Sequence, residues 1–198
     1  MRRKCWSGTR GDLCRPNTSV GAALPVATLE LRAFIRPELP PPSVEHLTGL
    51  LPESRALAGK VALVTGGSRG LGAALVQALA LQGCTVYLNY FKSEHEAAAV
   101  RDSLGKRAAN VHLLQGDGGD LEWCQRARAE ILGHHGRLDV LLCNACLPLQ
   151  PLRIEPDPTA RITEYVRKSL ALVHAPLSCF LEELARQQGW AVVLSSSA

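Results

Sequence analysis

The chain has 198 residues, of which 46% are apolar and 20% are charged, a composition typical of one soluble α/β domain with an additional segment. The net charge of +4 arises near the N-terminus, because residues 1–36 carry seven of the 22 basic side chains and only two of the 18 acidic ones. We therefore expect no nucleic-acid-binding face on the folded part. A membrane span is not expected either, since no apolar run approaches the roughly 20 residues that a membrane helix needs.

Residues 1–57 are interpreted as a basic, Pro-rich N-terminal extension or linker that is poorly ordered, because they contain seven of the 12 prolines. Within it, Ser43 to Leu51 could form a short helix capped by Ser43. The tail of an upstream domain and a linker that docks on the neighbouring fold both stay open. No continuous apolar segment follows the basic start, which argues against a secretory signal. The seven cysteines, an odd number, indicate reduced thiols and a cytoplasmic protein.

From residue 58 onward, short apolar runs alternate with segments of helical periodicity. We expect strands over residues 61–65, 84–89, 110–115, 138–143 and 190–195, and helices over residues 71–81, 93–104, 121–132 and 159–188. Ser93 with Glu96 forms a capping box, and Gly83 is expected to end a helix in the left-handed conformation. Pro176 is expected to interrupt or kink the last helix. The alternation predicts an α/β fold, namely a Rossmann-type doubly wound parallel sheet, over residues 58–198.

The stretch Thr65 to Gly72 reads Thr-Gly-Gly-Ser-Arg-Gly-Leu-Gly and lies between the first strand and the first helix of this domain. Glycines let the backbone turn tightly and approach a ligand closely. The N-terminus of the following helix attracts an anion. Because no Gly-Lys-Ser/Thr ending is present, a Walker-type loop is not expected, and the stretch predicts a site for the pyrophosphate of a dinucleotide.

Other polar residues also stand at the carboxyl ends of the expected strands, where parallel sheets bind their ligands. They are Asn89, Asp117, Asn144 and the serines at 195–197. The second strand ends in Asn89-Tyr90, without the carboxylate that would grip the ribose of NAD, and Arg69 can pair with a phosphate. NADP(H) is therefore favoured, and NAD(H) is possible. The alternative for Arg69 is a solvated loop charge.

With these motifs the sequence resembles the short-chain dehydrogenase/reductase family. The resemblance rests on Thr-Gly-x-x-x-Gly-x-Gly at 65–72, Gly116-Asp117, Cys-Asn-Ala-Cys at 143–146 and the run Val192 to Ser196. Residues 86–90 are most similar to the 3-ketoacyl-carrier-protein reductase-like branch. The resemblance implies an NADP(H)-dependent carbonyl reductase or alcohol dehydrogenase that acts on a small carbonyl or alcohol. It also implies a homo-oligomer that pairs through the long helix.

The resemblance further implies roles for individual residues. The implied cofactor-binding residues are Thr65, Gly66, Ser68, Arg69, Gly70, Leu71, Gly72, Asn89, Tyr90, Asp117, Asn144 and Ala145. Among them, Gly66, Gly70 and Gly72 would admit the pyrophosphate, Asp117 would contact the adenine and Asn144 the nicotinamide ribose. Ser196, or alternatively Ser195, would fix the substrate carbonyl. Ser169, or else Lys168, stands where the family has an Asn that supports a proton-relay water.

Three features depart from the family pattern. Cys146 replaces a glycine and Ser169 replaces the relay Asn, while no Tyr is followed four residues later by Lys. A redox or metal role for Cys143 and Cys146 is not expected, because no second Cys or His pair has metal-ligand spacing. The run Ala191 to Leu194 would moreover be an uncovered apolar sheet edge. We therefore expect a domain incomplete at its C-terminus, with little reductase activity. The alternatives are an inactive dinucleotide-binding module and an inert fragment.

Overall fold

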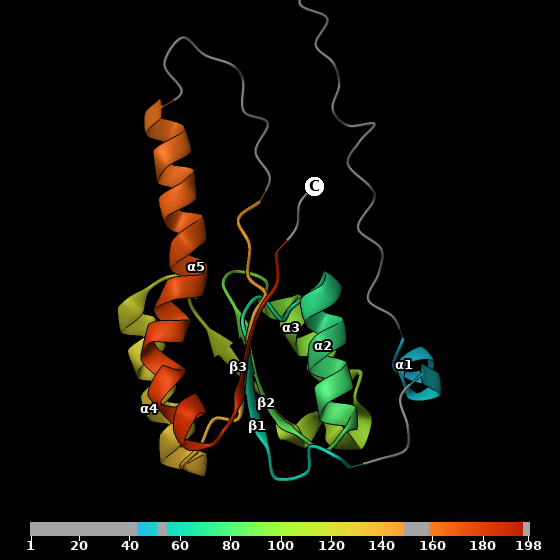
Figure 1. Ribbon diagram of the computed structural model, residues 1–198. Coiled ribbons are helices and arrows are strands. Elements are labelled where there is room, and N and C mark those ends of the chain that lie inside the picture. Colours follow the sequence, from blue (N-terminus) through green and yellow to red (C-terminus); the bar gives the residue numbers. More distant parts are fainter. Residues whose placement is uncertain (1–42, 51–54, 149–158, 196–198) are drawn as a thin grey trace, which may run out of the picture. The chain divides into compact units, whose positions relative to one another are not determined.

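The computed structural model describes residues 43–50, 55–148 and 159–195, which form an α/β fold (Figure 1). Most of the expected extension, the greater part of the proline-containing loop after residue 148, and Ser196 lie outside the described residues. Within the described part, no helix combines the length and the apolar character needed to cross a membrane.

Five parallel strands form one sheet in the order β3-β2-β1-β4-β5, which confirms the expected Rossmann-type arrangement. The strands are β1 (Val61–Val64), β2 (Thr85–Tyr90), β3 (Val111–Gln115), β4 (Val140–Cys143) and β5 (Trp190–Val193). In the register of the central strands, Leu63 of β1 lies between Tyr87 of β2 and Leu141 of β4. The carboxyl ends of these strands therefore meet at one edge of the sheet.

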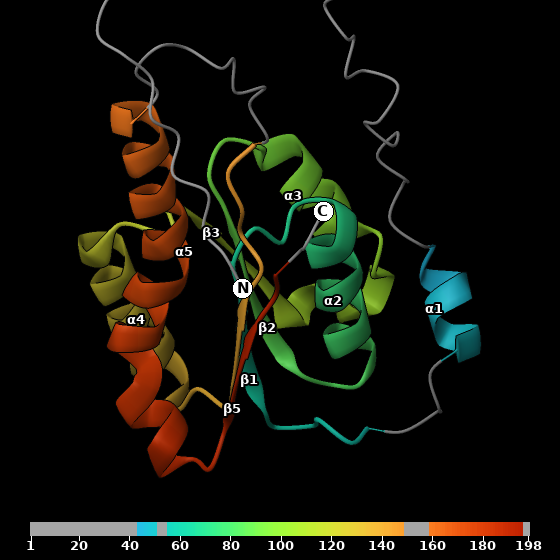
Figure 2. The ribbon, with the colours of Figure 1, turned by 45° about the horizontal axis from the view of Figure 1, so that its top comes forward.

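Helices cover both faces of the sheet (Figures 1 and 2). One face carries α2 (Gly70–Leu81), α3 (Glu94–Asp102) and the short 3₁₀ helix η2 (Gly105–Asn110), whereas α4 (Leu121–His135) and α5 (Thr159–Arg186) cover the other. The short helix α1 (Val44–Leu50) begins where the sequence suggested, with the N–H of His46 donating to Ser43 Oγ at 3.2 Å. Val44 and Leu47 of α1 pack against the core on the α2 side.

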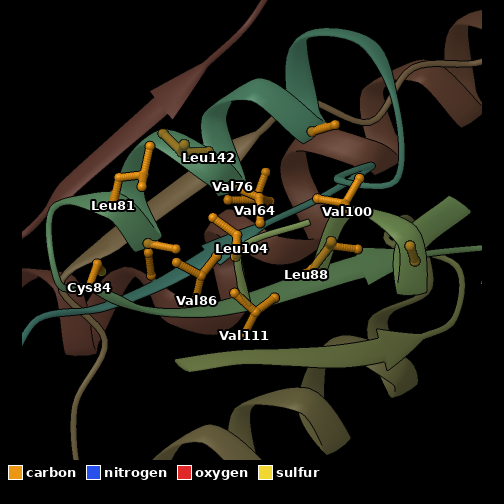
Figure 3. Close-up of a cluster of buried hydrophobic side chains, with 14 of the residues drawn as sticks. Val64, Val76, Leu81, Cys84, Val86, Leu88, Val100, Leu104, Val111 and Leu142 are labelled. Carbon is orange, nitrogen blue, oxygen red and sulfur yellow. The ribbon is translucent and has the colours of Figure 1, made fainter. Parts of the chain in front are cut away.

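Alternate residues of β1 to β4 point to opposite faces and contribute to two separate cores, whereas the edge strand β5 is exposed and contributes to neither. On the α2 side, Val64, Val86 and Leu88 of the sheet pack with Val76 of α2 and Val100 of α3 (Figure 3). On the other side, Leu63, Tyr87 and Leu141 of the sheet pack with residues of α4 and α5. The helix residues include Ile131 of α4 and Phe180 of α5. Burial on both faces explains why β1, β2 and β4 are mainly apolar runs rather than alternating ones. Strand β5 is also apolar but lies exposed at the edge of the sheet, as the sequence led us to expect for the run Ala191 to Leu194.

Helix ends differ from the sequence expectations in two places. Ser93 precedes α3 as expected, but its side chain makes no cap hydrogen bond, since its φ of −93° and ψ of 62° depart from the extended conformation typical of a capping residue. Helix α4 runs to His135 rather than stopping near Leu132. His134 and His135 therefore lie in the last turn of the helix. Gly136, with a φ of 65°, ends the helix in the left-handed conformation.

Helix α5 also differs, because it runs through Pro176 without the interruption that the sequence suggested. Pro176 is fully buried against the sheet side of the helix. Its neighbours Ala175 and Phe180 belong to the second core. Packing of this amphipathic face offsets the one backbone hydrogen bond that a proline removes.

Candidate functional site

The stretch Thr65–Gly72, called the glycine turn below, joins the carboxyl end of β1 to α2. Gly66 and Gly70 have φ values of 66° and 55°, a left-handed conformation that favours glycine. A Cβ on Gly72 would lie 2.2 Å from the carbonyl oxygen of Gly66, so that position admits no side chain. At Gly70, by contrast, a Cβ would meet no heavy atom within 4 Å. The turn is thus tightly packed on its inner side and open at Gly70.

The first turn of α2 begins at this open side. Arg69 occupies the N-cap position in an extended conformation, with φ −159° and ψ 171°, and its side chain makes no cap hydrogen bond. The first amides of a helix lack partners within the helix and need an acceptor from elsewhere. Arg69, Gly70 and Leu71 are exposed here. An anion at this place would accept from the amides and lie near the Arg69 guanidinium.

Thr65 fastens the glycine turn to the end of β4. Its buried hydroxyl accepts from the N–H groups of Asn144 and Ala145, at 3.0 and 3.1 Å, and donates to the carbonyl of Leu142 at 3.3 Å. The Asn144 Nδ2 in turn donates to the carbonyls of Thr65 and Gly66, at 3.1 and 2.9 Å. The structure therefore brings four of the residues inferred from the sequence, Thr65, Gly66, Asn144 and Ala145, into one hydrogen-bonded group.

The residues expected at the ribose and adenine lie beside the turn, but two of them point inward. Asn89 is 2% exposed, and its amide bonds to backbone groups of Gly66 and Gly116. Tyr90 is 6% exposed and belongs to the first core; burial and the nearby Glu94 raise the pKa of its hydroxyl. Asp117 is exposed, and its Oδ1 accepts from the N–H of Gly119 at 2.9 Å.

Sequence reasoning missed two features after the carboxyl ends of β2 and β3; the loop Gly116–Gly119 that follows β3 is called the adenine loop below, after the contact expected of Asp117. Trp123 Nε1 donates to the carbonyl of Gln115 at 2.8 Å, and its ring occupies the space where a Cβ on Gly116 would fall. Helical spacing indicates that Trp123 is buried but gives no sign of this hydrogen bond. Lys92, just after β2, holds its Nζ 5.2 Å from the centroid of the Phe91 ring and is a second exposed cation near the site.

Of the expected catalytic residues, the structure describes Ser169 and Ser195 but not Ser196. Ser169 is half-buried on α5, one turn before Leu172, whose backbone N would lie 3.4 Å from a Cβ on Gly119. Helix α5 therefore passes beside the adenine loop. Ser196 lies outside the described residues, and Ser195 is exposed. Cys146 is exposed, while burial raises the pKa of the Cys143 thiol to about 11.

Comparison with known proteins gives consistent matches. Residues 60–198 match the short chain dehydrogenase family. Versicolorin reductase 1 from Aspergillus parasiticus is 39% identical over 93 residues, which make up 47% of this chain and 36% of that protein. A metagenomic short-chain oxidoreductase in complex with NADP aligns with a TM-score of 0.64 and 26% identity, covering 72% of this chain and 64% of that one.

A second solved structure, an alcohol dehydrogenase from the archaeon Thermococcus sibiricus complexed with 5-hydroxy-NADP, aligns with a TM-score of 0.59 and 30% identity. The match covers 68% of this chain and 57% of that one. The chain thus spans less than two thirds of the length of each of these relatives.

Proposed function

This chain belongs to the short-chain dehydrogenase family, and we propose that its residues 58–198 bind NADP(H) as the cofactor part of a carbonyl reductase or alcohol dehydrogenase. The glycine turn carries the proposal. It admits no Cβ at Gly72, is open at Gly70 and leads into a helix whose N-cap side chain makes no hydrogen bond. Those features fit a pyrophosphate. When bound, the nicotinamide supplies the donor or acceptor of a hydride.

Residues around the glycine turn would make the remaining contacts with the cofactor, to its 2′-phosphate, its adenine and its ribose. Arg69 and Lys92 are exposed cations, suited to the 2′-phosphate that distinguishes NADP from NAD. Asp117 stands on the adenine loop and would contact the adenine. Asn144 already donates through Nδ2 to Thr65 and Gly66, so its Oδ1 is the atom that could accept from a ribose hydroxyl. The NADP and 5-hydroxy-NADP in the two solved relatives support this choice of cofactor.

Replacing Arg69 tests the cofactor choice. Arg69→Gln removes the charge that would pair with the 2′-phosphate, and a hydrogen bond to a charged group contributes about 1.5–3 kcal/mol. We expect the ratio of NADPH to NADH affinity to fall by about tenfold or more. Fluorescence titration with both cofactors measures the ratio. Arg107→Gln, which removes an exposed charge from η2, is the matched control and should leave the ratio unchanged. An unaltered ratio in Arg69→Gln would show that Arg69 is a solvated loop charge.

The catalytic step itself is a further part of the proposal. In a complete enzyme of this kind, Ser196 would hold the substrate carbonyl and Ser169 would support the relay of a proton. Within the 198 residues, Tyr87, Tyr90 and Tyr165 are followed four positions later by Phe91, Glu94 and Ser169, so no Tyr-x-x-x-Lys acid–base pair is present. We therefore expect this chain alone to bind the cofactor without turnover. Sustained oxidation of NADPH with any of a panel of ketones, measured by absorbance, would contradict this.

An inactive dinucleotide-binding module is the second candidate, favoured by the same missing pair. A chain that binds NADPH and remains inactive when combined with the C-terminal part of a related enzyme would support it.

We also propose a reducing, cytoplasmic setting, which the five free thiols of the described residues favour. We further propose that the protein forms a homo-oligomer through α5, because the apolar side chains of Val166 and Leu170 on this helix are exposed. A measurement of the molecular mass of the protein in solution tests this proposal.

A further inference from the structure

We infer that Asn89 is a positioning residue that holds the two halves of the dinucleotide site, the glycine turn and the adenine loop, at a fixed spacing. The inference rests on the proposed function, because it concerns the same site. The resemblance implied that Asn89 is a cofactor-binding residue, but the structure buries it to 2% exposure at the carboxyl end of β2. Strand β2 lies between β1, which leads into the glycine turn, and β3, which leads into the adenine loop.

Toward the glycine turn, Asn89 acts only as an acceptor. Its side-chain Oδ1 accepts from the N–H of Gly66 at 3.3 Å, and its backbone carbonyl accepts from the N–H of Gly67 at 2.9 Å. Both bonds bind the first glycines of the turn to β2. They therefore set how far the turn stands from that strand.

Toward the adenine loop, the same side chain acts as a donor. Nδ2 donates to the carbonyl of Gly116 at 2.9 Å and to that of Leu114 at 3.3 Å. A Cβ on Gly118 would come within 3.4 Å of Asn89 Oδ1, so the loop folds closely over this amide. One planar group thus bonds to the backbone of both halves.

An amide suits both tasks at this position, because its oxygen accepts on one side while its nitrogen donates on the other. A carboxylate could accept from Gly66 but could not donate to Gly116, and an aliphatic side chain of similar size could do neither. Asn89 contacts no part of the cofactor in this scheme and acts through the backbone on either side of it.

Fixed spacing matters because a dinucleotide is a ligand with two linked ends. When two subsites stand at the correct separation, binding of one end presents the other at a high effective concentration. Loss of that spacing lowers the affinity for the whole dinucleotide more than the affinity for either of its halves. A preorganised pair of subsites also avoids the ordering cost on binding. Asn89 should therefore control the advantage that NADPH holds over its nicotinamide mononucleotide half, which carries a phosphate for the glycine turn but no adenine for the adenine loop.

The test compares the dissociation constants of NADPH and reduced nicotinamide mononucleotide, which lacks the adenosine, by calorimetry, using the whole chain. In Asn89→Leu, which has similar volume but no hydrogen bonds, we expect the NADPH advantage to fall by about tenfold or more. Any loss of folded protein scales both constants equally and cancels in their ratio. Asn89→Ser, which keeps a small polar group, should show a smaller fall in the same direction and decides the matter if the Leu variant does not fold.

Gln77→Met is the matched control. Gln77 is another buried amide, 4% exposed, and its Nε2 donates to Ser103 Oγ at 3.0 Å, between α2 and the residue after α3. Its loss should lower stability and leave the ratio unchanged. An unchanged ratio in both Asn89 variants, or an equal change in Gln77→Met, would overturn the positioning role. If the unmutated chain binds neither ligand, the proposed function itself fails, which is a distinguishable result.

Discussion

At the scale of single residues, Asp139 is a buried charge that is held by three neighbouring residues. It stands before β4, at the end of the sheet opposite the glycine turn, and its side chain is 4% exposed. Lys60 Nζ donates to its Oδ1 at 3.0 Å, the N–H of Val61 donates to Oδ2 at 3.0 Å, and Arg137 contacts both oxygens. Burial alone would raise the pKa of this carboxyl, but the hydrogen bonds from Arg137, Val61 and Lys60 lower it overall.

Asp139→Asn should lower the free energy of unfolding at neutral pH by about 2–3 kcal/mol, because Lys60 and Arg137 lose their counter-charge. Urea unfolding measures the difference. Asp102→Asn is the control: its side chain is 64% exposed beside Arg101, and the change should stay below about 0.5 kcal/mol. Equal effects in the two variants would contradict the assignment.

The same carboxyl predicts a pH dependence. A pKa that folding lowers stabilises the protein fully above the ordinary value of about 4, and the stabilisation is lost as the pH falls through the folded value. Between pH 7 and about 5 the gap between the unmutated protein and Asp139→Asn should stay constant, and it should narrow below about pH 4. A gap that does not change down to acid pH would rule out this source of stability.

At the scale of elements, α4 offers a paired test of its two glycines. Gly133 lies inside the helix with nothing within 4 Å of a Cβ, whereas Gly136 ends it at a φ of 65°. Gly133→Ala should raise the free energy of unfolding by about 0.5–1 kcal/mol, because alanine restricts the unfolded chain and suits a helix. Gly136→Ala should lower it by about 1 kcal/mol, because alanine is strained in that conformation. Thermal unfolding measures both, and equal signs would contradict the observed helix end.

Elements were predicted well where local pattern decides them. The apolar runs and the glycine turn led to the five strands and to α2, because strands within a parallel sheet are nearly continuous apolar runs. The start of α3 after Ser93 was predicted, but the lack of a cap hydrogen bond there, the end of α4 at His135 and the continuity through Pro176 were not, because tertiary packing decides them. In the site, Asn144 lies against the glycine turn, as its place at the carboxyl end of the fourth strand predicted. The inward direction of Asn89 and the hydrogen bond of Trp123 depend on contacts between β2, β3 and α4 that no single segment of sequence displays.

At the scale of the whole described domain, the two cores on opposite faces of the sheet support different parts of the site. The core beneath α2 and α3 supports the glycine turn, while α4 and α5 support the adenine loop through Trp123 and the approach of Leu172 to Gly119. The proposed dinucleotide site would thus lie where elements from both faces meet. A ligand that bridges them should stabilise the fold as a unit, since binding to the folded state alone raises its stability.

The central claim is that the glycine turn binds NADP(H), and calorimetric titration of the purified chain with NADPH tests it most directly. We predict saturable binding at one site per chain that Gly133→Ala preserves. In Gly72→Ala, whose Cβ would fall 2.2 Å from the Gly66 carbonyl oxygen, we expect affinity weaker by about tenfold or more. Absence of saturable binding by the unmutated chain, or equal affinity in Gly72→Ala, would contradict the account.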